Sequence, residues 1–219
     1  TSEHNPRKFK RKKEDLLLKM FKKLDLKKGK NFVVLNFKSV HSPYEENYAN
    51  HPEFDVFKPN DNSRFEEENA SYDNAILYID SVLGQLLDEF KRLNVENSQF
   101  IFTSDHGEML GFPDGRYGHN QLVVEDMRVP FFLYNIGGKM PVLPNGLISH
   151  YEISKLTAQY LGYEVINPNY GDDVFFVHGN NLFEEYQFIE YQRKNGQLKE
   201  ILKDEVEGFI KGKIKKREE

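Results

Sequence analysis

The chain has 219 residues, 38% of them hydrophobic and 30% charged, with 18 Phe, 12 Tyr and no Cys. A chain of this length buries roughly 70% of the surface that it exposes when unfolded, so it needs no disulfide or metal to fold. The lack of Cys excludes thiol catalysis, Cys-ligated zinc and iron–sulfur clusters within this sequence. The net charge of -5 gives no overall signal for binding nucleic acid.

The charge is distributed unevenly along the chain. Residues 1–30 contain twelve Lys or Arg and four acidic residues, so this segment carries about +8 and the rest about -13. We expect residues 1–13 to form a basic flexible arm, with contact to nucleic acid or lipid headgroups as the alternative interpretation. No apolar run reaches the ~20 residues that cross a bilayer, and neither an initiator Met nor a signal peptide opens the chain. We therefore expect a piece of a longer protein.

Apolar periodicity predicts that helices and buried strands alternate in the first half of the chain. Residues 14–26 carry apolar side chains at helical spacing and are expected to form a short amphipathic helix. The β-branched and aromatic run 32–37 predicts a strand buried on both faces, which is typical of a parallel sheet. The turn-rich segment 39–65 predicts a long surface loop. A long helix over 66–93 then leads into a second buried strand at 99–104.

The alternation continues in the second half. A Gly- and Asp-rich loop over 107–126 precedes a third buried strand at 129–134. Ser149 is a good N-cap for a helix that extends to about residue 161.

The C-terminal part has a different pattern. A strand is expected at 174–177, and the segments 188–192 and 198–202 predict an antiparallel hairpin around the turn Asn195-Gly196. Residues 204–219 are expected to form a charged tail. Helices that alternate with buried strands place the chain in the α/β class. We expect a mostly parallel central sheet flanked by helices, with a small antiparallel hairpin near the C-terminus.

Candidate metal-binding and catalytic residues follow the predicted strands. His41 comes after the first strand, Asp105 and His106 come directly after the second, and His119 lies in the loop beyond. In open α/β sheets ligands bind beyond the carboxyl ends of the strands, so we expect these residues to share one pocket. An adjacent carboxylate and imidazole can both coordinate a metal. Gly107 would let the backbone approach the ion without a Cβ clash.

Each of these motifs also has a simpler structural interpretation. Asp105-His106-Gly107 alone could be a turn in which the Asp caps a following helix. His41 or His119 alone is more often an ordinary loop histidine. The functional interpretation depends on the longer pattern around them.

That longer pattern resembles a known superfamily. Residues 72–110 run from Tyr-Asp-Asn through a helix and a strand into Ser-Asp-His-Gly-Glu. They resemble the alkaline-phosphatase superfamily, specifically its sulfatase and phosphoethanolamine-transferase branch. His41-Ser42-Pro43-Tyr44, Tyr117-Gly118-His119 and Met127-Arg128-Val129-Pro130 match this branch in the same order. The resemblance covers about residues 14–165. It implies an alkaline-phosphatase-like α/β/α sandwich, with residues 14–203 as the C-terminal part of its catalytic domain.

The resemblance also implies roles for individual residues. Asp105 and His106 would be metal ligands, and His41 and His119 would be the catalytic residues that contact the reacting group. Zn²⁺ is the expected cofactor, or Ca²⁺ or another divalent ion if the protein is a sulfatase. The ion would act as a Lewis acid, while the histidines would stabilise charge or protonate the leaving group. Glu108 would at most orient a ligand.

The family's nucleophile is missing from this sequence. In the family it lies upstream of the first strand, together with another acidic metal ligand, and no such motif precedes Asp15. We therefore expect half of the metal shell to lie outside the chain. Alone, the chain should bind zinc poorly and be weakly active or inactive.

Three functions are compatible with this pattern. The first is a metal-dependent phosphoethanolamine transferase that moves its group from a phospholipid donor to a surface glycolipid or glycan. Such a protein would have a periplasm-facing soluble domain, anchored in the inner membrane through a missing N-terminal region, and no nucleic-acid partner. The alternatives are a sulfatase or phosphoester hydrolase of the same superfamily, and a non-catalytic relative.

Overall fold

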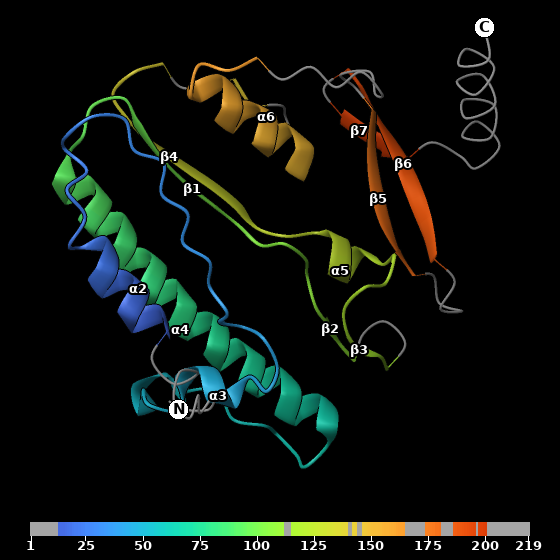
Figure 1. Ribbon diagram of the computed structural model, residues 1–219. Helices are drawn as coiled ribbons and strands as arrows, with labels where there is room; N and C mark the ends of the chain where they lie inside the picture. Colours follow the sequence, from blue (N-terminus) through green and yellow to red (C-terminus); the bar gives the residue numbers. More distant parts are fainter. Residues whose placement is uncertain are drawn as a thin grey trace, which may run out of the picture. The chain divides into compact units, whose positions relative to one another are not determined.

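The computed structural model describes residues 13–111, 115–139, 142–143, 146–164, 174–180, 186–195 and 197–200 (Figure 1). The chain divides into two compact units. The first comprises Thr1–Thr103, Leu110–Tyr117 and Phe131–Gly138, and the second comprises Ser104–Met109, Gly118–Pro130 and Lys139–Glu219. The predicted basic arm falls almost entirely outside the described residues, and the charged tail does so completely.

A single long helix, α4 (Arg64–Leu93), organises the first unit. The Ser63 side chain caps its N-terminus by accepting a hydrogen bond from the Glu66 backbone N–H. Its first turn is acidic and its last turn is basic, which suits the helix dipole at both ends. Asn94 ends the helix in the left-handed conformation that Asn tolerates better than most residues. These local signals explain why the predicted helix over 66–93 is confirmed.

The core of the first unit lies where three short helices pack on α4. These are α2 (Lys13–Phe21), α3 (Glu45–Tyr48) and a 3₁₀ helix, η2 (Pro52–Phe54). The segment predicted as a loop thus contains two short helices. Ala75 and Leu86 of α4 are fully buried in this core, which removes their apolar surface from water.

The first unit contains an antiparallel strand pair. Strand β1 (Ser98–Thr103) pairs with β4 (Phe131–Ile136), with Ser98 opposite Ile136 and Thr103 opposite Phe131. The mostly parallel central sheet is therefore not confirmed, because all strand pairs with a defined register in the described residues are antiparallel. Apolar strands are typical of parallel sheets, but composition does not determine strand direction.

The segment 32–37, predicted as a strand of that sheet, belongs to no strand in the structure. Leu35 and Phe37 pack against the core, whereas Phe32 is 66% and Val34 72% exposed. A β-strand requires a hydrogen-bonded partner, and none of the described segments pairs with this one. Its composition favours a strand, but no described segment lies in position to form the hydrogen-bonded pair that a strand needs.

The second unit contains helix α6 (His150–Tyr160) and a three-stranded antiparallel sheet. Ser149 caps the start of α6 as predicted, and the structure adds a capping box with Glu152. The sheet has the order β5-β6-β7, formed by β5 (Val174–Asn180), β6 (Tyr186–Lys194) and β7 (Gln197–Glu200). The predicted C-terminal hairpin is confirmed as the β6–β7 pair.

Three short elements complete the described structure. Strands β2 (Met109–Leu110) and β3 (Tyr117–Gly118) form a two-stranded sheet, and α5 (Val124–Met127) precedes β4. Within the described ranges, no helix is long and apolar enough to span a membrane.

Candidate metal and catalytic site

The turn that follows β1 is held by hydrogen bonds among its own residues. The Ser104 hydroxyl donates to the His106 carbonyl oxygen over 2.8 Å, and the His106 backbone N–H donates to Asp105 Oδ1 over 3.1 Å. His106 Nδ1 lies 2.7 Å from the Gly107 carbonyl oxygen. Because a carbonyl oxygen only accepts, Nδ1 carries the proton in this hydrogen bond. That leaves His106 Nε2 as the ring nitrogen available to a metal.

Gly107 allows this turn to lie directly against α5. Its N–H donates to the Asp126 carbonyl oxygen over 2.7 Å. A Cβ atom at this position would lie 2.0 Å from the Glu125 carbonyl oxygen, much closer than any non-bonded contact permits. The glycine was expected to prevent a clash with an ion. In the structure it prevents a clash with protein backbone.

Three side chains of the second unit converge beside this turn. The rings of His106 and His119 stack with centroids 4.0 Å apart, and His119 Nδ1 lies 3.4 Å from Glu108 Oε2. One ligand atom from each of His106, Glu108 and His119 lies within 4.8 Å of the others. The Glu108 side chain is only 12% exposed. Two imidazoles and a shielded carboxylate are a suitable donor set for a divalent transition metal.

Asp105 has a different position from the one expected of a ligand. Its side chain is 88% exposed, and its Oδ1 lies 3.8 Å from His106 Nε2. The converging group therefore contains His106 of the predicted ligand pair, with Glu108 in place of Asp105. The assignment of Asp105 as a metal ligand stays a prediction.

Sequence reasoning gave Glu108 only an orienting role. The signal that could have identified it is spacing, because side chains at positions i and i+2 of an extended segment lie on the same face. His106 and Glu108 have this spacing just before β2, whereas Asp105 precedes them at a bend and is exposed.

His119 is supported by backbone contacts of the loop that follows it. The Asn180 backbone N–H donates to the Asn120 carbonyl oxygen over 2.8 Å, and the Leu122 N–H donates to Asn180 O over 2.9 Å. The buried Asp126 carboxylate accepts a 2.6 Å hydrogen bond from the Gln121 N–H. Strand β5 and helix α5 thereby fix the loop that carries His119.

His41, the other predicted catalytic histidine, lies in the first unit. Its side chain is exposed, and its Nδ1 lies 2.7 Å from the Ser42 carbonyl oxygen. The Asn47 side chain organises this turn by accepting from the Val40 N–H and donating to the His41 and Tyr44 carbonyl oxygens. Val40 adopts φ 67°, which is unusual for a β-branched residue. The convergence of His41 with the other three residues stays a prediction.

Comparison with known proteins provides an independent test of this pattern. The family model described as Sulfatase matches residues 2–163. An ulvan-active sulfatase of Formosa agariphila is 35% identical over 101 residues, which are 43% of this chain and 19% of that protein. An arylsulfatase of Clostridium perfringens is 39% identical over 72 residues, 31% of this chain and 14% of that protein. No solved structure matches the chain.

These matches span less than a fifth of the length of the two curated relatives. They confirm the resemblance to the sulfatase branch of the alkaline-phosphatase superfamily, whereas they contain no phosphoethanolamine transferase. The family model covers well over half of the sequence, including His41, the Ser-Asp-His-Gly-Glu turn and His119. The chain belongs to the sulfatase family.

Proposed function

We propose that this chain supplies metal-binding and substrate-binding residues of a sulfatase, an enzyme that hydrolyses sulfate esters. The observation that carries the proposal is the group of His106, Glu108 and His119, which converges at the family's characteristic turn. The names of both curated relatives support hydrolysis of sulfate esters rather than phosphoethanolamine transfer. The sulfatase alternative therefore replaces the transferase as the main hypothesis.

The proposed metal-binding residues favour zinc over calcium. Sulfatases are metal-dependent, and His106, Glu108 and His119 would hold the ion here. Imidazole nitrogens suit zinc, whereas calcium prefers six to eight oxygen ligands. When bound, the ion would stabilise negative charge on the sulfate oxygens as a Lewis acid. Asp105 could join as a further ligand after rotation of its exposed side chain.

The protein residues would contribute orientation and proton transfer. The hydrogen bond from His106 Nδ1 to the Gly107 carbonyl fixes the ring so that Nε2 is presented to the site. The Nδ1 of His41 is likewise directed at a carbonyl, that of Ser42, so its ring would act as a general acid only in the imidazolium form, giving the Nε2 proton to the departing alkoxide and keeping the one on Nδ1. His119 would either coordinate the ion or donate a hydrogen bond to the sulfate group.

The test is sulfate release by the gene product that carries this chain. The purified protein is incubated with p-nitrophenyl sulfate and with a sulfated polysaccharide, after removal of metal and after addition of Zn²⁺ or Ca²⁺. We expect metal-dependent sulfate release that is lost in His106→Ala. A p-nitrophenyl phosphate arm and a phosphoethanolamine-lipid arm with a glycolipid acceptor run in parallel. Turnover only in the lipid arm would contradict the proposal and favour transfer between a phospholipid and a glycan.

A further inference from the structure

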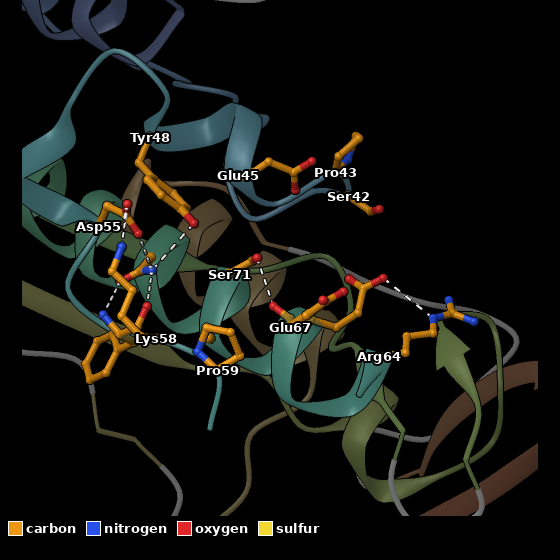
Figure 2. A pocket seen from close by; sticks show the side chains of 14 residues that line it. Ser42, Pro43, Glu45, Tyr48, Asp55, Lys58, Pro59, Arg64, Glu67 and Ser71 are labelled. Carbon is orange, nitrogen blue, oxygen red and sulfur yellow. Dashed lines mark hydrogen bonds and ion pairs between the residues drawn. The ribbon is translucent and has the colours of Figure 1, made fainter. Parts of the chain in front are cut away.

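The first unit contains a groove that the metal site does not use. It has a volume of about 630 Å³ and lies between α4 and the segment from Ser42 to Pro59 (Figure 2). This volume is within the range of roughly 300–1,000 Å³ that small-molecule sites occupy. Its first lining residue, Ser42, directly follows His41, the predicted catalytic histidine. The groove is therefore lined by the residue next in sequence to His41, the candidate proton donor.

Asn74, which is 1% exposed, builds one wall of this groove. Its Oδ1 accepts hydrogen bonds from the Val56 and Phe57 backbone N–H groups over 2.9 and 2.8 Å. Its Nδ2 donates to the Phe57 carbonyl oxygen over 2.9 Å and to the Tyr48 hydroxyl over 3.5 Å. One buried amide thus holds the loop that carries Phe57 against α4. The Phe57 side chain lines the groove and is 46% exposed.

The cations at the groove already have carboxylate partners. Lys58 Nζ lies 2.6 Å from Asp55 Oδ2, and Arg64 Nε lies 3.7 Å from Glu68 Oε1. Glu45 and Glu67 also line the groove and form no ion pair among the described residues. The groove therefore has excess negative charge, contributed by α3 and α4 together (Figure 2).

We propose that this groove binds an uncharged sugar unit of the substrate. The choice of ligand rests on the proposed sulfatase function. Carboxylates only accept hydrogen bonds, so Glu45 and Glu67 are suited to the hydroxyl groups of a sugar. The exposed ring of Phe57 offers an apolar face to the C–H side of a pyranose. Six of the fourteen lining residues are charged, which favours a polyhydroxylated ligand over the apolar ring of a simple aryl sulfate.

The same charges make the groove selective. A second sulfate group on the bound sugar would be repelled by Glu45 and Glu67, and its desolvation would be left uncompensated. The groove should therefore prefer a sugar unit without sulfate to the same unit carrying one. Salt should weaken this discrimination, since it screens charges exposed at a surface.

Ligand-observed NMR on the 219-residue chain tests the binding directly. The probes are the neutral disaccharides maltose, cellobiose and lactose, a sulfated disaccharide of matched size, and phenol as the aryl probe. We expect saturation transfer to at least one neutral disaccharide and roughly fivefold weaker binding of the sulfated one at low salt. Phe57→Ala should weaken neutral-sugar binding roughly three- to tenfold. The backbone bonds between Phe57 and Asn74 remain in this variant.

Two further variants separate selectivity from general damage. Glu67→Gln retains a hydrogen-bond acceptor but loses the charge, so it should bind the sulfated disaccharide more tightly with little change for the neutral one. Asp80→Asn, on the same helix but outside the groove, should change neither. Absence of binding by every neutral disaccharide, tighter binding of the sulfated one, or preference for phenol would each overturn the inference. Sugar binding without sulfate release would contradict the proposed sulfatase function and leave the groove intact as a sugar site.

Discussion

Gly107 is the residue on which the geometry of the candidate metal site most directly depends. The turn from Ser104 to Glu108 can lie against α5 only because no side chain separates it from the Glu125 carbonyl oxygen. The candidate ligands His106 and Glu108 flank this position on either side. Backbone packing around a residue without a side chain therefore determines where two candidate ligands point.

Replacing Gly107 with Ala should destabilise the second unit and weaken metal binding. The new Cβ would require the turn or α5 to move, and such overpacking typically costs ~1–3 kcal/mol. Gly84→Ala is the matched control, because Gly84 lies in α4 with open space around its Cβ position. It should stabilise the protein by about 0.5–1 kcal/mol. Urea denaturation and zinc titration of both variants provide the measurement. Unchanged stability in Gly107→Ala would contradict the observed contact.

Substitutions of Glu108 and Asp105 should lower zinc affinity to very different extents. If the converging group is the metal site, Glu108→Gln should lower zinc affinity about 10- to 100-fold or more. Asp105→Asn should have a much smaller effect, since its side chain is 88% exposed. Competition with a chromophoric zinc chelator measures both affinities on the same preparation. Loss of affinity in Asp105→Asn alone would restore the ligand pair predicted from the motif.

At this scale, the sequence indicated which segments would carry the candidate residues, whereas the roles of those residues stay predictions. His106 and His119 were expected in one pocket from strand-end positions, and the structure brings them together. Glu108 was expected at most to orient a ligand; the structure places it in the converging group, and its role as a ligand stays a proposal. Contacts such as Gly107 against Glu125 involve residues far apart in sequence, which no local pattern predicts.

At the scale of elements, local signals explain which predictions were confirmed. The helix α4 has a capping residue, suitably charged ends and a continuous apolar face, all within its own sequence. The segment 32–37 has no such local signals that suffice on their own, because a strand forms only when it pairs with another segment of the polypeptide. The same limitation explains the antiparallel direction of β1 and β4, which depends on how the chain returns rather than on strand composition.

The N-terminus of α6 is joined to β6 by a shielded ion pair. Arg193 Nε and Nη2 donate to Glu152 Oε1 and Oε2 over 2.8 and 2.6 Å, and Nη2 also donates to the Leu147 carbonyl oxygen. The two side chains are only 11% and 15% exposed. Arg193→Met should destabilise the second unit by ~3–5 kcal/mol, because it leaves a shielded carboxylate without its partner. Urea denaturation of the single variants and of Arg193→Met/Glu152→Met measures the coupling. Additive losses would show that the pair contributes nothing.

A second prediction at this scale concerns α2 and α4. Burial raises the pKa of the Tyr78 phenol, and the nearby Asp15 and Glu14 of α2 raise it further. The unfolded chain releases this proton near pH ~10, whereas the folded protein retains it. Stability should therefore fall as the pH rises above about 10, because the unfolded state then binds fewer protons.

Tyr78→Phe should remove the part of the stability loss at alkaline pH that comes from the Tyr78 phenol. Unfolding free energies of wild type and variant, measured in urea between pH 8 and pH 11, should diverge progressively above about pH 10. Tyr163→Phe is the control, since Tyr163 is 69% exposed and belongs to the second unit. Parallel curves for wild type and Tyr78→Phe would contradict the proposed effect of burial.

At the scale of the whole molecule, the division into two units predicts that a metal will stabilise one of them selectively. All three candidate ligands belong to the second unit, whereas the proposed sugar-binding groove lies in the first. A ligand that binds only the folded state stabilises it by ~2.7 kcal/mol at a concentration of 100 Kd. Zinc should thus slow amide exchange in residues 104–109 and 118–127. The amides of α4, whose protection depends on its own core, should be unaffected.

Hydrogen exchange followed by mass spectrometry, with and without zinc, resolves the two units within one experiment. Glu108→Gln serves as the control, because it should reduce the zinc-dependent protection in the second unit without changing exchange in the first. A neutral disaccharide provides the reciprocal comparison and should protect the groove segments around Phe57 and Glu67. Equal zinc protection of both units would mean that they unfold together. Zinc protection that persists in Glu108→Gln would place the ion elsewhere, because the structure contains Glu108 in its converging group of three ligands.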